Sequence, residues 1–395
     1  SMTDLVTLIF ASAIQARASD VHIEAEEKQI KVRFRIDGFL YDVVTVKKEL
    51  WDKIVNRIKL LAKLKINITD IPQDGRFTIY LSDETIDVRV STVPSAYGES
   101  IVMRLLMSSA ASISLEELGL TKEQYTTLEK QIKRPNGMIL NTGPTGSGKT
   151  TTLYAVLKKL NKPETKIVTL ENPIEYHLSG ITQSQVETAD ANADSGSSAG
   201  SKKRHYTYAI GLKSVLRQDP DVVMVGEIRD KETVETAIQA SLTGHLMLST
   251  LHTNSAAGAI PRLLSMEAKP FLLAPALNVI IGQRLVRLIC EQCRERYTPD
   301  EETMQHIHQI IDSLPTEKKQ DSTTEALTFF RGKGCSACNH IGFKGRIGIF
   351  ELLVMNEEIQ KLILASQISE AQIEEAAKRY GMLTMVQDGV LKALK

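Results

Sequence analysis

The sequence predicts an α/β protein with a parallel-sheet core that carries a phosphate-binding loop, a smaller N-terminal α+β domain, and a C-terminal tetracysteine module with helices. Three patterns support this fold class: a glycine-rich loop between strand-like and helix-like runs, period-two strands near the start, and two Cys-x-x-Cys pairs near the end. We expect an N-terminal domain over residues 1–107, a linker over 108–114, a core over 115–289, a cysteine module over 290–342 and a helical part over 343–395.

The glycine-rich loop carries most of this interpretation. Residues 143–150 read GPTGSGKT and match G-x-x-x-x-G-K-[ST], with an apolar run before them and a helix-like run after them. Its backbone N–H groups would wrap a β-phosphate, Lys149 would neutralise the β- and γ-phosphates, and the Thr150 hydroxyl would bind Mg²⁺. A glycine-rich turn that mimics the pattern is the alternative, and the flanking elements disfavour it. The nucleotide-binding candidates are Gly143, Pro144, Thr145, Gly146, Ser147, Gly148, Lys149, Thr150 and Thr151.

Composition limits the function classes. A chain of 395 residues with 42% hydrophobic and 24% charged residues is typical of a globular protein with two or three domains. The most apolar stretch, residues 271–281, is too short to span a bilayer, and no signal peptide opens the chain, so we expect a cytoplasmic protein. The opening Ser1-Met2 suggests that the natural N-terminus is missing. A formal net charge of zero argues against a nucleic-acid groove as the main function.

Local patterns outside the loop indicate how the rest of the chain is organised. The N-terminal part begins with an amphipathic helix over 5–17 and continues with alternating strands over 30–36, 76–80 and 86–90. Residues 108–114 are small and read as a linker. Residues 188–204 are polar and rich in Gly and Ser, which predicts a disordered surface loop or an engineered linker.

The four cysteines form two Cys-x-x-Cys pairs, Cys290 with Cys293 and Cys335 with Cys338, separated by 41 residues. Two such pairs build a tetrahedral four-sulfur site that suits Zn²⁺ and leaves no open coordination position, so we expect a structural metal site. Disulfides are disfavoured in a reducing compartment, and a thioredoxin-like redox role would need one pair rather than two. The long gap predicts a helical excursion over about 303–314.

Acids and histidines near the loop are the candidates for catalysis. Glu227 ends an apolar run at a position that approaches the Mg²⁺ shell in P-loop enzymes. The acid here is Glu rather than Asp, which suggests that it contacts the metal through water. Glu171 and Glu175 follow another apolar run, where a carboxylate could act as general base. The alternative is that these are acidic turn residues after strands. His245 and His252 bracket a further strand and could sense a γ-phosphate.

The order of these motifs resembles the hexameric type II secretion and type IV pilus ATPases. The resemblance covers nearly the whole chain and implies a RecA-like P-loop NTPase core. Residues 18–24 and 72–76 look like the second N-terminal domain of that family, which is PAS-like, and we expect the first N-terminal domain to be absent from this sequence. The tetracysteine module is typical of the assembly and secretion branch, because retraction motors generally lack it.

The resemblance implies roles for individual residues. Glu175 would be the general base with Glu171 beside it, Glu227 would support Mg²⁺ and water, and His252 with His245 would form a histidine box. By the same resemblance, basic residues from the N-terminal domain complete the site like an arginine finger; the matching residues are Arg76, Arg89 and Arg104. Ordinary ion pairing on a strand face is the alternative for each arginine. Asn172 stands where the family usually has Asp, so we assign its side chain no charged role.

The resemblance also implies cofactors and partners: ATP, Mg²⁺ and Zn²⁺, a homo-hexamer, an inner-membrane platform and a cytoplasmic adaptor, with indirect membrane association and no nucleic acid. ATP hydrolysis would then drive assembly of a secretion pseudopilus or a type IV pilus, and the sequence leaves that choice open. A DNA-uptake or helicase-like motor, a pilus retraction motor and a nucleotide-regulated scaffold remain as alternative functions.

Overall fold

The computed structural model describes residues 2–107, 113–187, 205–315, 318, 327–365 and 368–394. Most of the predicted linker and the whole of the predicted loop at 188–204 lie outside these residues. The chain divides into two compact units, residues 1–112 with 334–345, and residues 113–333 with 346–395. The five-part division expected from the sequence stays a prediction.

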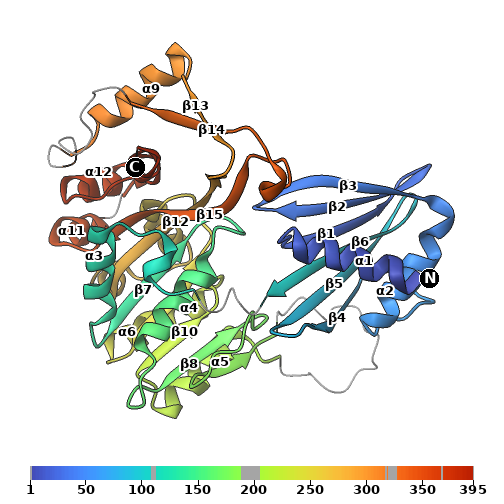
Figure 1. The fold of residues 1–395 in the computed structure, drawn as a ribbon. Coiled ribbons are helices and arrows are strands. Elements are labelled where there is room, and N and C mark those ends of the chain that lie inside the picture. The colour runs from blue at the N-terminus through green and yellow to red at the C-terminus, as the bar shows by residue number, and fades with distance from the viewer. Residues whose placement is uncertain are drawn as a thin grey trace. The chain divides into compact units, whose positions relative to one another are not determined.

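The N-terminal unit is an α+β body built on one antiparallel sheet of six strands, in the order β3-β2-β1-β6-β5-β4. Figure 1 shows helices α1 and α2 beside this sheet. The strands are β1 (Asp20–Ala25), β2 (Gln29–Ile36), β3 (Phe39–Lys47), β4 (Gln73–Tyr80), β5 (Thr85–Ser95) and β6 (Gly98–Met107), and the helices are α1 (Met2–Gln15) and α2 (Trp51–Leu61).

Period-two alternation places the hydrophobic core of this unit on one face of the sheet. In β5, Ile86, Val88 and Val90 are buried, while the residues between them are not. They pack with Ile9 and Phe10 of α1 and with residues of α2 in one cluster. The opposite face of the sheet therefore carries the polar side chains of the same strands.

The second unit contains a seven-stranded sheet in the order β15-β12-β7-β11-β10-β8-β9. Its inner strands read as continuous apolar runs because both faces are covered. Parallel pairing joins β12 to β7, β7 to β11, β11 to β10, β10 to β8, and β8 to β9. The strands are β7 (Gly137–Thr142), β8 (Ile167–Glu171), β9 (Thr182–Gln185), β10 (Val222–Val225), β11 (Leu246–Leu251), β12 (Leu277–Ile289) and β15 (Phe343–Val354).

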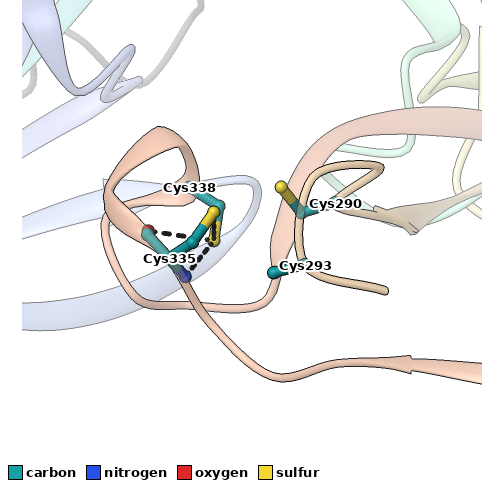
Figure 2. A group of neighbouring side chains, drawn as sticks. All are labelled: Cys290, Cys293, Cys335 and Cys338. Atoms are coloured by element: carbon teal, nitrogen blue, oxygen red, sulfur yellow. Dashed lines mark hydrogen bonds between the residues drawn. The ribbon is translucent and has the colours of Figure 1, made fainter. Parts of the chain in front are cut away.

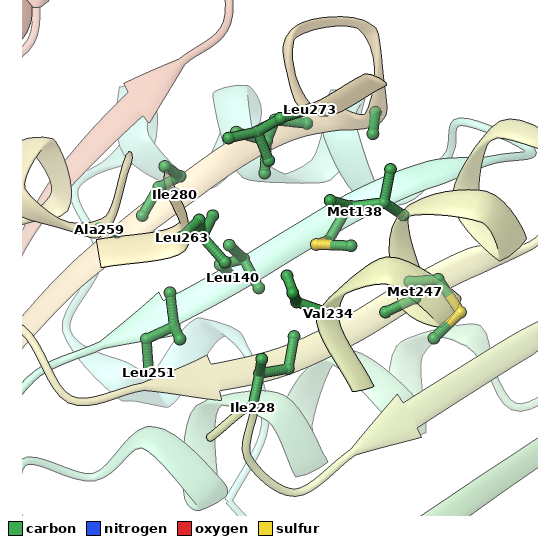
Figure 3. Close-up of a cluster of buried hydrophobic side chains, with 14 of the residues drawn as sticks. Met138, Leu140, Ile228, Val234, Met247, Leu251, Ala259, Leu263, Leu273 and Ile280 are labelled. Atoms are coloured by element: carbon green, nitrogen blue, oxygen red, sulfur yellow. The ribbon is translucent and has the colours of Figure 1, made fainter. Parts of the chain in front are cut away.

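Helices cover the two faces of this sheet. One face packs on α3 (Lys122–Ile132) and α4 (Lys149–Leu160). The other face packs on α5 to α8, and Figure 3 shows part of that core around Met138, Leu140 and Val234. These helices are α5 (Tyr208–Val215), α6 (Lys231–Leu242), α7 (Ala256–Ser265) and α8 (Pro270–Ala276).

The described residues of the C-terminal third add a two-stranded ribbon and the helices α9, α11, α12 and α13. The ribbon consists of β13 and β14, and α9 is the helical excursion expected between the cysteine pairs. Buried Asp388 accepts hydrogen bonds from Phe350 N at 2.8 Å, Gln124 Nε2 at 3.1 Å and Lys392 Nζ at 2.5 Å. No helix in the described ranges is long and apolar enough to cross a membrane. The elements are β13 (Arg294–Tyr297), β14 (Phe329–Gly332), α9 (Glu301–Asp312), α11 (Glu357–Leu364), α12 (Glu370–Arg379) and α13 (Met385–Ala393).

Candidate nucleotide site and tetracysteine site

The phosphate-binding loop (residues 143–150) connects β7 to α4 at the carboxyl edge of the parallel sheet. Gly148 caps α4 with a φ of 88°, in the left-handed region that favours glycine. Gly143 has a φ of 153°, and a Cβ there would lie 2.4 Å from the carbonyl oxygen of Gln283. Glycine is therefore required at both ends of the loop for different reasons, one conformational and one steric.

Lys149 is folded into the loop. Its side chain is buried, and Nζ donates to Gly143 O at 2.8 Å and to Pro144 O at 2.9 Å. Burial lowers the pKa of Lys149, while the charge of Glu227 opposes that shift. Ser147 Oγ is buried and has no hydrogen-bond partner among the described residues. A phosphate in the loop would supply both the counter-charge and the missing acceptor, so these residues fit the nucleotide predicted from the motif.

The remaining loop residues are placed as the motif requires. Pro144, Thr145 and Gly146 are exposed at the tip of the loop, and Thr150 and Thr151 are half-buried in the first turn of α4. The hydroxyl of Thr150 thus follows directly after the buried lysine, where it could bind Mg²⁺ beside a phosphate.

Gln283 supports the loop from β12, and the sequence analysis missed it. Its Oε1 accepts hydrogen bonds from Asn141 Nδ2 at 2.9 Å and from Thr152 Oγ1 at 2.8 Å. A Cβ on Gly148 would lie 2.8 Å from its Nε2. One buried side chain therefore joins the strand before the loop to the helix after it. No motif could reveal this, because Gln283 lies more than a hundred residues from the loop in sequence.

Glu227 and His252 meet at the same edge of the sheet. Glu227 Oε2 lies 2.6 Å from Arg229 Nε and 3.6 Å from His252 Nε2, which is too long for a hydrogen bond. Burial, followed by the charge of Lys149, lowers the pKa of His252 from 6.5, so this imidazole is neutral at pH 7. The structure therefore brings Lys149, Glu227 and His252 together at one edge of the sheet.

Glu171 is held in a buried hydrogen-bond network. Its carboxylate accepts hydrogen bonds from Thr169 Oγ1 at 2.5 Å, from Gln183 Nε2 at 3.0 Å and from the Tyr154 hydroxyl of α4. Burial and the charge of Glu171 raise the pKa of Tyr154, which keeps this phenol a donor. Three donors on one buried carboxylate point to a supporting role for Glu171.

The same network holds the segment that carries Glu175. Gln183 Nε2 also donates to Tyr176 O at 2.9 Å, and its Oε1 accepts from Leu178 N at 2.7 Å. Glu175 itself is half-buried in this segment, four residues after the end of β8. Gln183 therefore anchors the chain that directly follows Glu175.

His245 is not brought to the phosphate-binding loop. It precedes β11, and its carbonyl oxygen accepts from Gly137 N at 3.2 Å, at the start of β7. Leu246 pairs with Gly137 and Leu251 pairs with Thr142, so His245 lies a full strand length, about 20 Å, from the loop. The expectation that both histidines sense the γ-phosphate is corrected, because only the carboxyl end of a parallel strand meets the loop.

The three predicted arginines form a row in the N-terminal unit. Arg76 of β4 pairs with Arg89 of β5, and Arg89 pairs with Arg104 of β6. Arg104 in turn pairs with Asp20 of β1, to which its Nε donates at 3.0 Å. Residues that are directly opposite on neighbouring strands share a face. This arginine row (Arg76, Arg89 and Arg104) therefore lies side by side on the polar face of the sheet.

The four cysteines gather at one place, as predicted. Their sulfur atoms all lie within 4.8 Å of one another, and Figure 2 shows the side chains. Sulfurs bound to one zinc at about 2.3 Å in a tetrahedron lie about 3.8 Å apart, and Cys335 Sγ lies 3.8 Å from Cys338 Sγ. Backbone N–H groups of Cys335 and Gly342 also donate to Cys338 Sγ, which lies 3.3 Å from Cys335 O. The cluster fits a structural Zn²⁺ site.

Comparison with known proteins places the chain in a family. The model of the family "Type II/IV secretion system protein" matches residues 1–395. The chain belongs to this family. A type II secretion system ATPase E from Vibrio cholerae is 46% identical over 371 residues, which are 94% of this chain and 68% of that protein. A type II secretion system protein E from Pseudomonas aeruginosa is 44% identical over 391 residues, 99% of this chain and 72% of that protein.

Solved structures show the same fold as this type II/IV secretion system protein. The ATPase DotB of Legionella pneumophila matches with a TM-score of 0.64 at 20% identity, over 97% of this chain and 90% of that chain. The pilus retraction motor PilT with bound ADP matches with a TM-score of 0.55 at 24% identity, over 96% and 94% of the two chains. The predicted fold class is confirmed. With its phosphate-binding loop and its family, the chain is a secretion ATPase.

We predict that the cysteine cluster holds one structural zinc. Protein purified without chelators should contain about one zinc per chain by mass spectrometry of the metal. Replacing both Cys335 and Cys338 by Ser should remove the zinc and lower the melting temperature, because metal binding contributes to folding. Ser336→Ala, in the same loop, should keep the metal. Zinc retained by the double variant would contradict this assignment.

We predict that Gln283→Leu weakens ATP binding. The change removes the acceptor of the buried Thr152 hydroxyl and one of the two acceptors of Asn141 Nδ2, and should destabilise the protein by about 1–3 kcal/mol. Because the loop loses its support, KM for ATP should rise about tenfold, equivalent to about 1.4 kcal/mol. The control is Gln387→Leu, a buried glutamine bound to Ser313, which should lower stability only. An unchanged KM in Gln283→Leu would show that Gln283 has no role in the loop.

Proposed function

We propose that this secretion ATPase acts as a homo-hexamer at the cytoplasmic face of the inner membrane, where ATP hydrolysis powers assembly of a secretion pseudopilus. The observation that carries the proposal is the convergence of Lys149, Glu227 and the Glu171–Gln183 network at one edge of the sheet, in a chain 46% identical to a type II secretion ATPase. An inner-membrane platform and a cytoplasmic adaptor would be its partners, and its membrane association would be indirect.

The relatives favour a role in type II secretion over a role as a type IV pilus, retraction or DNA motor. Those named above are called type II secretion proteins, which supports a pseudopilus over a type IV pilus. The likeness to the retraction motor is 24% identity and extends only to the fold, so we do not propose retraction. The formal net charge of zero continues to disfavour a DNA motor.

Within the site, the burial and position of each residue suggest its role in ATP hydrolysis. Lys149 would bind the β- and γ-phosphates, and Thr150 would hold Mg²⁺, which neutralises phosphate charge when bound. Glu227, with a side chain 13% exposed, would orient the metal-bound water. Glu175 would accept the proton of the attacking water. Glu171 already accepts three hydrogen bonds, so its role would be to fix the Glu175 segment.

The arginine row would complete the site when ATP is bound. Like charges placed directly opposite on adjacent strands repel one another and destabilise the sheet. An anion such as the γ-phosphate would relieve that repulsion, and the arginines would then stabilise negative charge during hydrolysis. The nucleotide would thereby link the N-terminal unit to a core, within one subunit or between two. Such a link, made with ATP and lost on hydrolysis, would convert the reaction into movement.

We predict that Glu175→Gln abolishes most ATP turnover. The amide cannot accept the proton of the water, so kcat should fall about 10²- to 10⁴-fold, while KM for ATP stays nearly constant. Turnover is measured by phosphate release, alone and with the cytoplasmic part of the platform protein. Glu267→Gln, in a surface ion pair with Lys231, is the control and should keep the wild-type rate. Wild-type turnover in Glu175→Gln would refute the assignment of the base.

We predict that Arg89→Gln, at the centre of the arginine row, lowers kcat well over tenfold, because an arginine finger contributes about 10³ or more to kcat. The melting temperature is measured alongside turnover, so that a loss of kcat caused by unfolding is recognised. The control is Lys31→Gln, because Lys31 forms an ion pair with Asp42 on an exposed surface. This change should leave kcat unaltered. If both variants hydrolyse ATP equally fast, the arginine row does not act on the nucleotide.

A further inference from the structure

Tyr208 lies between the two acidic segments of the nucleotide site, although no motif indicated it. It is the first residue of α5, which packs on β8 and β10. A Cβ on Gly226, the residue before Glu227, would lie 2.9 Å from the Tyr208 hydroxyl, 3.2 Å from Leu170 O and 3.6 Å from Glu171 Cα. The hydroxyl therefore lies where β8 and β10 end, next to the residues that carry the two carboxylates.

Close packing fixes the position of this side chain. A Cβ on Gly211 of α5 would lie 2.9 Å from Leu170 Cδ2, so glycine at this position lets the helix approach the β8 side chains closely. Gly226 N donates to Leu170 O at 2.7 Å, which joins the ends of the two strands. Within the part of the chain that the structure describes, no hydrogen bond of the Tyr208 hydroxyl is found. Packing alone therefore aims the hydroxyl at the gap between the acids.

The charges around the hydroxyl keep it a donor. Burial, then the charge of Glu227 and to a smaller extent that of Glu171, raise the pKa of Tyr208, and Arg229 opposes the shift. The phenol is thus neutral at any physiological pH and can offer its proton to a carboxylate. The present partner of Glu227 is Arg229, whose side chain is 62% exposed. An exposed ion pair contributes little, so Arg229 orients Glu227 only weakly.

We propose that Tyr208 is a positioning residue of the hydrolytic site, whose hydroxyl donates a hydrogen bond to the Glu227 carboxylate in the ATP-bound state. A neutral donor would orient this carboxylate toward bound Mg²⁺ and its water while leaving the carboxylate charge intact, whereas an arginine would cancel that charge. The inference rests on the role of Glu227 given under the proposed function. It adds a residue from α5, an element that none of the motifs covers.

A double-mutant cycle on the full chain tests this inference. The variants are Tyr208→Phe, Glu227→Gln and the pair combined, with Tyr206→Phe as the matched control, since Tyr206 shares a hydrogen bond with Ser184 at 2.8 Å. We expect Tyr208→Phe to lower kcat about tenfold, or about 1.4 kcal/mol. KM, the Kd of a fluorescent ATP analogue and the melting temperature should stay at the wild-type values. The pair combined should be no slower than Glu227→Gln alone, because the two residues act as a unit.

The outcomes separate this inference from the proposed function. The inference is overturned if Tyr208→Phe turns over ATP within twofold of the wild-type rate while Glu227→Gln is slow. The proposed role of Glu227 would then still stand. A combined variant that is a further tenfold slower than Glu227→Gln also overturns it, since Tyr208 would then act independently. Wild-type turnover in Glu227→Gln shows that the proposed role of Glu227 has failed, and the role of Tyr208 fails with it. A loss of kcat in Tyr206→Phe equal to that in Tyr208→Phe would overturn the inference as well.

Discussion

The parallel alignment of β7 with β11 and β12 is the constraint on which the nucleotide site depends. Thr142 pairs with Leu251 and with Gly282, so the next residues of both neighbouring strands lie beside the start of the phosphate-binding loop. Gln283 thereby contacts both ends of the loop. A slip of one residue would turn its side chain to the other face of the sheet. The same alignment sends His252 to the site and leaves His245 at the opposite edge.

Burial divides the acidic residues into those that support the site and those that can act in it. Glu171 is buried, and its three donors already satisfy its carboxylate. Among the described residues, Glu227 has the exposed Arg229 as its close ion-pair partner and His252 Nε2 at 3.6 Å, and it interacts electrostatically with Lys149 and Tyr208. An acid that is fully hydrogen-bonded holds a backbone segment in place, whereas an acid with spare acceptor capacity can bind a metal-bound water. We therefore propose that the chemistry depends on Glu227 and on the Glu175 segment, which Glu171 supports.

The arginine row poses a different electrostatic problem. Like charges opposite one another on adjacent strands repel, and Asp20 offsets this repulsion at the Arg104 end of the row through a 3.0 Å contact. The cysteine cluster is the opposite case, since four thiolates would also repel one another and a bound zinc would remove that cost.

The sequence by itself determined the chemistry of this protein. The phosphate-binding loop, the cysteine pairs and the acids after apolar runs are local patterns, because a phosphate or a zinc ion needs fixed residue types at fixed short spacings. The parallel sheet also followed from apolar runs that alternate with helical ones. The sequence could not say which residues meet across the sheet. Gln283, Gln183 and Tyr208 reach the site from distant segments, and strand register and helix packing, which depend on the whole core, decided where they lie.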